Sequence, residues 1–224
     1  PGIATEPIIC VGIYDSLEKL YTSFVYQNDI SPGIQTALLD ECLHEKFYFR
    51  NEEDMLKALV EYIHTSEPDV ITGWNLIQFD LTYLINRLLR LSINPNKLSP
   101  MNSTYVREQK DVVIKGISLI DMYVAYRKLT FSHEESYKLD FIAKKIVHEG
   151  KVDTEQNIPW MWKYNIEKLI NYNINDVRLC VLIDSKMGMV EFMDEIRRLC
   201  FCQLEDTLTS SRTADSYILK MFHG

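Results

Sequence analysis

The sequence predicts a single α/β domain built on a mixed sheet, and three observations lead to this fold class. Two strand-like runs come first, "PIICVGIY" at 7–14 and "LYTSFVY" at 20–26. Strand-like and helical segments then alternate, and the last part of the chain is helical. The chain has 224 residues, of which 46% are hydrophobic, and this is enough for one well-packed domain.

The first quarter of the chain opens with a predicted hairpin, because only "DSLEK" separates the two strand-like runs. We expect a loop over the mixed stretch 28–46 and a short strand at "FYFR", 47–50. Asn51 then stands where a helix begins, with Asp54 at the spacing of a capping box. Apolar residues from Met55 onward repeat at helical spacing and give that helix a core face.

The middle of the chain predicts two β units. "EPDVITGW" is a turn followed by a buried strand, and a helix is expected from Asp80 to about Leu91. The stretch 92–111 is polar and irregular. "DVVIKGISLID", 111–121, then predicts a second β unit with a bend at Gly116.

The last part of the chain predicts helices only. A short helix follows Asp121, and a second one is capped by Ser136. We treat the chain as one domain, with an α/β core and a helical segment after it. The later helices are expected at 137–147, 163–187, 190–201 and 212–222. The α/β core is expected to cover residues 1–187, and the helical segment residues 188–224.

Composition excludes some functions. The sequence contains no run of about 18 consecutive apolar residues, so no membrane span is predicted. No signal peptide is predicted either. The net charge of −8 argues against a general grip on duplex DNA, which usually needs a basic surface. It is compatible with a site that holds metal ions, since such sites need carboxylates. Five cysteines without metal-ligand spacing indicate reduced thiols in a cytosolic setting.

Asp80 stands at an unusual place in "VITGWNLIQFDLTYLINR", residues 70–87. An apolar strand has just ended there and an apolar helix is about to begin. A carboxylate at such a junction could cap the helix or hold a metal ion.

Asp176 is unusual because it leaves the polar face of its helix. The polar residues of this helix recur at spacings of three and four and mark its solvent face: Lys168, Asn171, Asn175 and Arg178. At 100° per residue, Asp176 lies about 130° from that face, on the side of Leu169 and Ile183, with Tyr172 one turn earlier. A lone carboxylate there costs several kcal/mol unless it is neutralised, paired or bound to a metal. A buried Asp bonded to Tyr172 or to an Arg is the simpler alternative.

Together the two aspartates favour a metal site. Carboxylates that converge at the end of a sheet suit a hard divalent cation such as Mg²⁺. Two such ions about 4 Å apart can activate a water and stabilise the leaving oxygen of a phosphodiester. The hydroxyl of Tyr172 could position that water.

Two segments resemble known motifs at this point. "GWNLIQFDLTYLINR" resembles the second exonuclease motif of family B DNA polymerases, and "YNIND", 172–176, resembles the third. The resemblance covers nearly the whole chain and is strongest with replicative polymerases of large tailed phages. It implies an RNase H-like fold, a mixed sheet flanked by helices. It also implies a 3′–5′ exonuclease that proofreads for an attached polymerase.

The resemblance also implies roles for individual residues. Asp80 and Asp176 would be ligands of Mg²⁺ or Mn²⁺ in a two-metal site, and Tyr172 would orient the attacking water. Lys151, in "EGK", aligns with a lysine near the scissile phosphate in phage relatives.

The remaining motif residues would contact substrate. Asn75 and Phe79 would shape the pocket for a DNA strand end, with core packing as the alternative for Phe79. Asp121 is expected to cap a helix first and to neighbour the substrate second. The expected partners are the single-stranded 3′ end of DNA and the palm and N-terminal domains of a parent polymerase. The expected location is the cytoplasm of a bacterial or phage-infected cell, with no membrane contact.

One departure from the family pattern is large. The first motif of the family is an Asp-x-Glu on the opening strand, and none precedes "EPIICVGIY" here. The chain begins without Met, and no palm signature follows. We therefore expect an exonuclease domain without its first strand, weak or inactive by itself. Glu6 is not assigned a catalytic role.

Two other functions stay open. One is a catalytically silent module that binds single-stranded DNA through aromatic residues and the basic pairs 127–128 and 144–145, although such pairs are usually solvated surface. The other is a free-standing RNase H-like nuclease that acts in repair.

Overall fold

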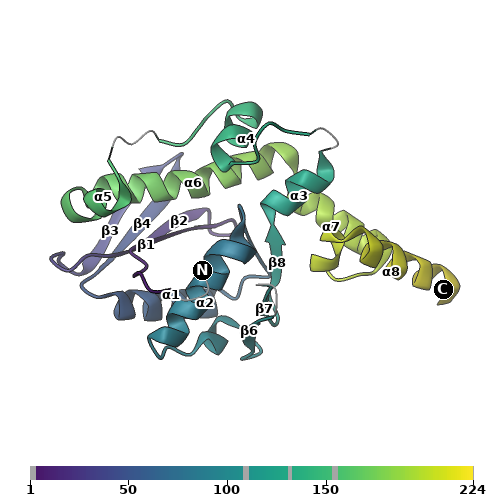
Figure 1. The fold of residues 1–224 in the computed structure, drawn as a ribbon, viewed down its shortest axis with the longest axis horizontal. Coiled ribbons are helices and arrows are strands. Elements are labelled where there is room, and N and C mark those ends of the chain that lie inside the picture. Colours follow the sequence, from purple (N-terminus) through teal and green to yellow (C-terminus); the bar gives the residue numbers. More distant parts are fainter. Residues whose placement is uncertain (1–3, 108–110, 131–132, 153–155, 224) are drawn as a thin grey trace.

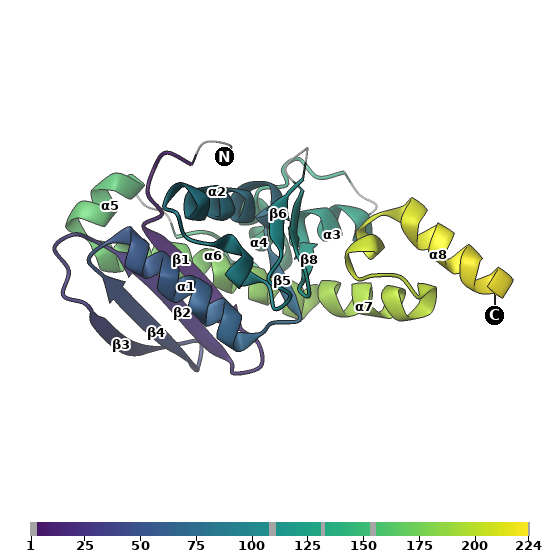
Figure 2. The ribbon, with the colours of Figure 1, turned by 90° about the horizontal axis from the view of Figure 1, so that it is seen from below.

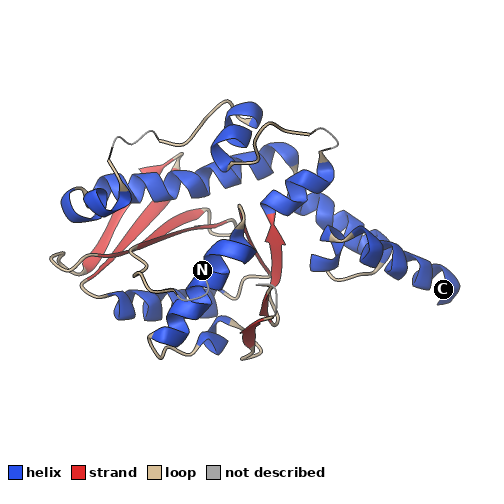
Figure 3. Cartoon of the chain, in the orientation of Figure 1, coloured by secondary structure: helices blue, strands red, loops and turns tan. Residues whose placement is uncertain are grey.

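The computed structural model describes residues 4–107, 111–130, 133–152 and 156–223 (Figure 1). A layer of strands lies between a long helix on one side and two helices on the other, and the C-terminal helices extend away from it (Figures 1 and 3). None of the helices in these ranges combines the length and apolar character needed to cross a lipid bilayer.

The largest sheet has the strand order β1-β2-β4-β3. β1 and β2 are antiparallel, which confirms the predicted hairpin. β2 is parallel to β4, and β4 is antiparallel to β3, so the sheet is mixed as predicted. The strands are β1 (Cys10–Asp15), β2 (Leu20–Tyr26), β3 (Gly33–Leu39) and β4 (Cys42–Phe49).

The predicted loop at 28–46 is wrong, because β3 and most of β4 lie there. β3 is an edge strand whose side chains are almost all exposed, so it shows no apolar alternation. Its backbone ladder with β4 holds it in place. The turn between them uses Asp40 and Glu41, both with positive φ.

Two smaller sheets complete the strands described by the structure. β5 (Val70–Gly73) is parallel to β8 (Ser118–Asp121), and β6 (Thr104–Val106) is antiparallel to β7 (Val112–Ile114). The predicted bend at Gly116 is confirmed, with φ of +89°. Within the stretch expected to be irregular lie β6 and a short 3₁₀ helix, η2 (Pro95–Leu98).

The helices follow the predicted order with shifted boundaries. Asn51 caps α1 by accepting the N–H of Asp54 at 2.8 Å, as predicted. The predicted cap at Ser136 is wrong, because Lys138 precedes the helix and Ser136 only accepts its N–H. The helices are α1 (Glu52–Ser66), η1 (Leu76–Leu81), α2 (Thr82–Arg90), α3 (Met122–Leu129), α4 (Leu139–Ile146), α5 (Ile158–Tyr164), α6 (Ile166–Met187), α7 (Met189–Cys200), η3 (Glu205–Leu208) and α8 (Ser210–His223).

The four-stranded sheet and the β5–β8 sheet both lie alongside α6 (Figure 2). Phe24 of β2 and Leu119 of β8 belong to the core beneath α1 and α2. Val25 of β2 packs with Ile170 of α6. Ile120 of β8 packs with residues farther along α6. Helix α6 therefore covers both sheets on one face, and α1 and α2 cover the other.

An interval separates the two sheets beneath α6. Gly12 of β1 lies so close to α6 that a Cβ there would be 2.7 Å from Oδ1 of Asn173 and 3.1 Å from Cγ2 of Val177. The α6 residues in the core cluster against which Val70 and Trp74 pack are Leu179 and Ile183. The two contact zones are about six residues apart, or about 9 Å along the helix. Neighbouring strands lie about 4.8 Å apart, so this distance along α6 is about twice the spacing of paired strands.

The facing edge of β1 has peptide groups directed into this interval. The N–H of Tyr26 donates to the carbonyl of Ile9 at 3.0 Å. Alternation of the antiparallel ladder then directs the peptide groups of Cys10, Gly12 and Tyr14 away from β2. Among the described residues, β1 is paired with β2 alone and β5 with β8 alone, so each of these two strands has an unpaired edge.

Candidate active site

Asp80 lies in a π-helical turn, η1, which joins β5 to α2. The prediction that a helix begins at Asp80 is wrong, and so is a capping role, since the helical backbone starts at Leu76. The turn leaves Phe79 and Asp80 exposed and places Leu81 in the core. Single π-helical turns are rare and often mark functional sites.

The Asp80 carboxylate lies near other charged groups. Loss of hydration beside the protein and repulsion by Asp121 raise its pKa to about 6. Asp176 contributes less to this increase, while the backbone N–H of Asp80 and the Lys151 ammonium act in the opposite direction. The structure therefore brings Asp80 within electrostatic range of Asp176, although the two residues lie on separate elements. Because water reaches Asp80, these interactions are partly screened.

Asp176 lies on the inward side of α6, as the helical spacing predicted. Its neighbours on that side, Leu169 and Ile183, are buried. The Nζ of Lys151 donates to its Oδ2 at 2.5 Å. Its Oδ1 is buried and has no hydrogen-bond partner in the described residues. The alternative considered from the sequence was that Asp176 bonds to Tyr172 or to an Arg. The structure shows instead a bond to a lysine from a loop, Lys151.

Lys151 and Tyr172 lie beside this carboxylate. The ammonium of Lys151 is 5.7 Å from the centre of the Tyr172 ring, within the range of a cation–π contact. Burial lowers the pKa of Lys151, but the bond and charge of Asp176 raise it by more. At Asp176, burial raises the pKa, and Lys151 offsets this only in part. The surroundings of Asp176 therefore disfavour the ionised form of its carboxylate.

Asp121 organises the turn that carries Asp80. Its Oδ1 accepts the N–H of Tyr123 at 3.0 Å, which confirms the predicted helix cap. It also accepts the N–H of Asn75 at 3.1 Å, and its Oδ2 accepts that of Ile77 at 3.3 Å. These two bonds were not predicted, because they depend on the left-handed backbone of Asn75, with φ of +57°. Asp121 thus ties the end of β8 to the start of η1.

Phe79 is 56% exposed. The alternative that it is a core residue is therefore wrong. An exposed aromatic ring next to a carboxylate can stack on a nucleic-acid base. Asn75 is exposed as well, so both residues predicted to contact a strand end are at the surface.

The carboxylate oxygens at this site are donors of the type that a hard cation binds, but they would make up only part of its coordination shell. Asp80 and Asp176 offer carboxylate oxygens, which Mg²⁺ and Mn²⁺ prefer. The unpartnered Oδ1 of Asp176 is the kind of atom that a cation would satisfy. Within the described ranges, no three His, Cys, Asp or Glu side chains gather as a metal site. The donor chemistry of these two carboxylates therefore fits a divalent cation.

The structure thus shows an α/β domain in which the carboxylates of Asp80 and Asp176 interact electrostatically and the ring of Phe79 is exposed. Comparison with known proteins identifies the family. Residues 35–142 match the family model described as DNA polymerase family B, exonuclease domain. This match includes Asp80 and Asp121 and ends before Lys151.

Curated relatives extend the similarity over the rest of the chain. The DNA-directed DNA polymerases of Escherichia phage RB69 and Enterobacteria phage T4 are each 24% identical, over 97% and 95% of this chain. The DNA polymerase catalytic subunit of human herpesvirus 8 is 30% identical over 59% of it. The chain spans about a quarter of the two phage polymerases, 27% and 25%. These findings confirm the predicted relationship with the exonuclease domain of family B DNA polymerases.

Proposed function

We propose that this domain is a 3′–5′ exonuclease that removes mispaired 3′-terminal nucleotides for a DNA-directed DNA polymerase. The observation that carries the proposal is the electrostatic interaction between Asp80 and Asp176, which lie on separate elements, together with an exposed aromatic ring next to Asp80, in a chain related to such exonucleases. The expected partners are a single-stranded 3′ end and the other domains of the polymerase. The expected location is the cytoplasm of a bacterial or phage-infected cell.

The proposed fold is RNase H-like, with one central strand supplied from outside these residues. The interval between β1 and β5 along α6 supports this proposal. In the family that the chain resembles, the first motif is an Asp-x-Glu strand. A strand in the interval would pair with both edges and add carboxylates between α6 and η1. Without it, we expect these residues to be a weak or inactive nuclease.

The proposed cofactor is Mg²⁺ or Mn²⁺, held in part by Asp80 and Asp176. When bound, a pair of such ions activates water and stabilises the leaving oxygen of a phosphodiester. Tyr172 would orient the attacking water through its hydroxyl, and Lys151 would neutralise charge on the scissile phosphate. The exposed ring of Phe79 would stack on the terminal base, with Asn75 at its side.

The test uses a polymerase that carries this domain. Asp80→Ala and Asp176→Ala should each lower the digestion of a 3′-labelled single strand by orders of magnitude. Nucleotide incorporation should be largely unchanged. Asp69→Ala, which removes an exposed carboxylate just before β5, is the matched control and should leave both activities intact. Equal loss of digestion and incorporation in the Asp80 variant would contradict a separate exonuclease site.

One observation favours the silent binding module as a second candidate. Lys151 already forms an ion pair with Asp176, and no three His, Cys, Asp or Glu side chains in the described residues gather as a metal site. A module of this kind would bind a single-stranded 3′ end equally well with EDTA and after Asp80→Ala. The exonuclease proposal expects divalent ions to strengthen binding and Asp80→Ala to remove that gain.

A further inference from the structure

The loop that carries Lys151 is fixed to two helices. The backbone N–H of Lys151 donates to Oδ1 of Asp140, on α4, at 2.7 Å. The carbonyl of Gly150 accepts from Nδ2 of Asn175, on α6, at 3.3 Å. Glu149 forms an ion pair with Arg178 at 2.5 Å. Three successive loop residues are therefore attached to the helices on either side.

Close packing against α4 supports the same conclusion. A Cβ on Gly150 would be 2.7 Å from Oδ1 of Asp140 and 2.5 Å from Cε of Lys144. The loop backbone thus lies directly on the Asp140 side chain. The other oxygen of Asp140 bonds to Nζ of Lys144 at 2.8 Å. This second bond fixes the carboxylate, so its Oδ1 stays directed at the loop.

The result is a lysine directed at a candidate metal ligand. Its Nζ lies 2.5 Å from Oδ2 of Asp176, while Oδ1 of the same carboxylate is buried and unpartnered. An ammonium at that distance occupies one face of the carboxylate and repels any cation that approaches. A divalent ion that uses both oxygens of Asp176 must displace it.

We propose that Asp140 is a positioning residue: by accepting the backbone N–H of Lys151, it directs the Lys151 ammonium onto Asp176, where the ammonium holds the place of a divalent cation and must leave when the cation binds. The proposal rests on the proposed exonuclease site. It adds that the Lys151 ammonium competes with a divalent cation for Asp176. The ammonium released by the cation would then be free to meet the phosphate of a substrate.

The test measures Mn²⁺ affinity of the purified chain by the relaxation of water protons. Lys151→Met removes the competing charge, and Mn²⁺ should bind about tenfold more tightly. Asp140→Ala removes the acceptor that directs the loop, and binding should also tighten. Asp140→Asn keeps an oxygen acceptor for the N–H of Lys151, so binding should stay the same or weaken. Loss of negative charge alone would instead weaken binding in both Asp140 variants.

Controls separate this proposal from the proposed site itself. Lys57→Met removes an exposed positive charge on α1 and should leave Mn²⁺ affinity unchanged. Asp140→Ala combined with Lys151→Met should bind no more tightly than Lys151→Met alone, because the two act through one ammonium. Unchanged affinity in Lys151→Met, with binding lost in Asp176→Asn, would overturn the proposal and keep the metal site. Failure of the parent chain and of Lys151→Met to bind Mn²⁺ would overturn both.

Discussion

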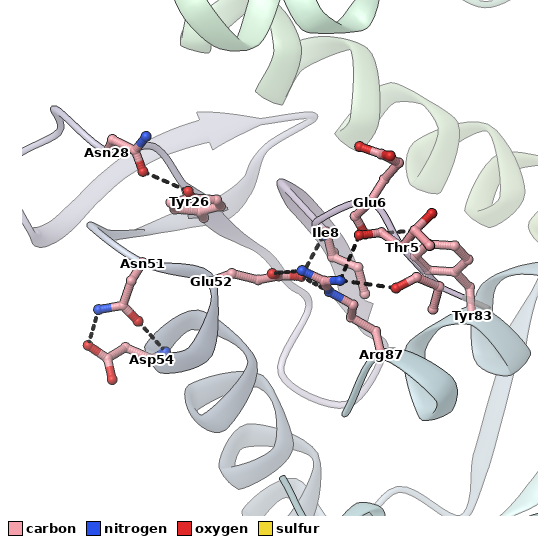
Figure 4. A network of polar contacts seen from close by, with 11 residues as sticks. Thr5, Glu6, Ile8, Tyr26, Asn28, Asn51, Glu52, Asp54, Tyr83 and Arg87 are labelled. Atoms are coloured by element: carbon pink, nitrogen blue, oxygen red, sulfur yellow. Dashed lines mark hydrogen bonds and ion pairs between the residues drawn. The ribbon is translucent and has the colours of Figure 1, made fainter. Parts of the chain in front are cut away.

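Two ion pairs in this domain join distant parts of the chain, but they differ in how completely their atoms are satisfied. In the first, Arg87 of α2 donates to both oxygens of Glu52 at 2.7 and 2.5 Å (Figure 4). Its Nη1 donates to the carbonyls of Ala4 and Thr5 at 3.0 and 2.9 Å. Glu52 also accepts the N–H of Ile8 at 2.7 Å. This pair binds α1, α2 and the N-terminal segment together.

The second pair, Lys151 with Asp176, is less complete. One bond joins the two side chains, each about a third exposed, at 32% and 29%. One carboxylate oxygen is buried without a partner among the described residues. A fully bonded pair fixes the fold, because breaking it leaves a buried charge. A partly bonded pair retains an oxygen that can still bind a ligand. This difference distinguishes the structural pair, Arg87 with Glu52, from the pair at the candidate site.

The largest effect is expected at the structural pair. Arg87→Met leaves the buried Glu52 carboxylate without its partner and should lower the free energy of unfolding by about 3–5 kcal/mol. Urea unfolding followed by circular dichroism measures this loss. Adding Glu52→Leu should restore part of it, because the second change removes the unpaired charge. A loss below about 1 kcal/mol in the single variant would mean that the network is not needed for the fold.

A much smaller effect on stability is expected at the second pair. Lys151→Met should change the free energy of unfolding by no more than about 1 kcal/mol, since water reaches both side chains. The same urea experiment applies. If this variant lost as much stability as Arg87→Met, the contrast between the two pairs would disappear and Lys151 would be a structural residue.

A third effect is a pH dependence of stability at Asp80. Its pKa is raised from 3.8 to about 6 in the folded chain, so between these values the folded state binds a proton that the unfolded state lacks. In this window the contribution of Asp80 to stability increases as the pH falls. Asp80→Asn should therefore be more stable than the parent at pH 7 without metal, and the difference should shrink toward pH 4. Thermal unfolding across this range measures it, and a constant difference would contradict the raised pKa.

Local patterns in the sequence predicted the parts that depend on local physics. Helical spacing placed Asp176 on the inward side of α6, and the position of Asp121 before an apolar helix predicted its capping bond. The edge strand β3 was missed because its exposed residues carry no apolar alternation. The π-helical turn was missed as well, since nothing in residues 76–81 distinguishes it from an ordinary first helical turn.

Contacts between distant segments lay beyond such patterns. The bond between Lys151 and Asp176 depends on the loop that Asp140 and Asn175 hold. Family resemblance singled out Lys151 but gave no hint of this arrangement. The hydrogen bonds from Arg87 to the carbonyls of Ala4 and Thr5 could not be predicted either, because every residue has a backbone carbonyl and the sequence does not show which ones accept a bond.

The central claim is that Asp80 and Asp176 together hold a divalent cation. Crystals of a polymerase that carries this domain, grown with Mn²⁺, would test it through anomalous scattering. The account predicts an anomalous peak within bonding distance of carboxylate oxygens from both Asp80 and Asp176, with the Lys151 ammonium moved away from Asp176. Mn²⁺ bound elsewhere, with the Lys151–Asp176 bond intact at saturating metal, would contradict it.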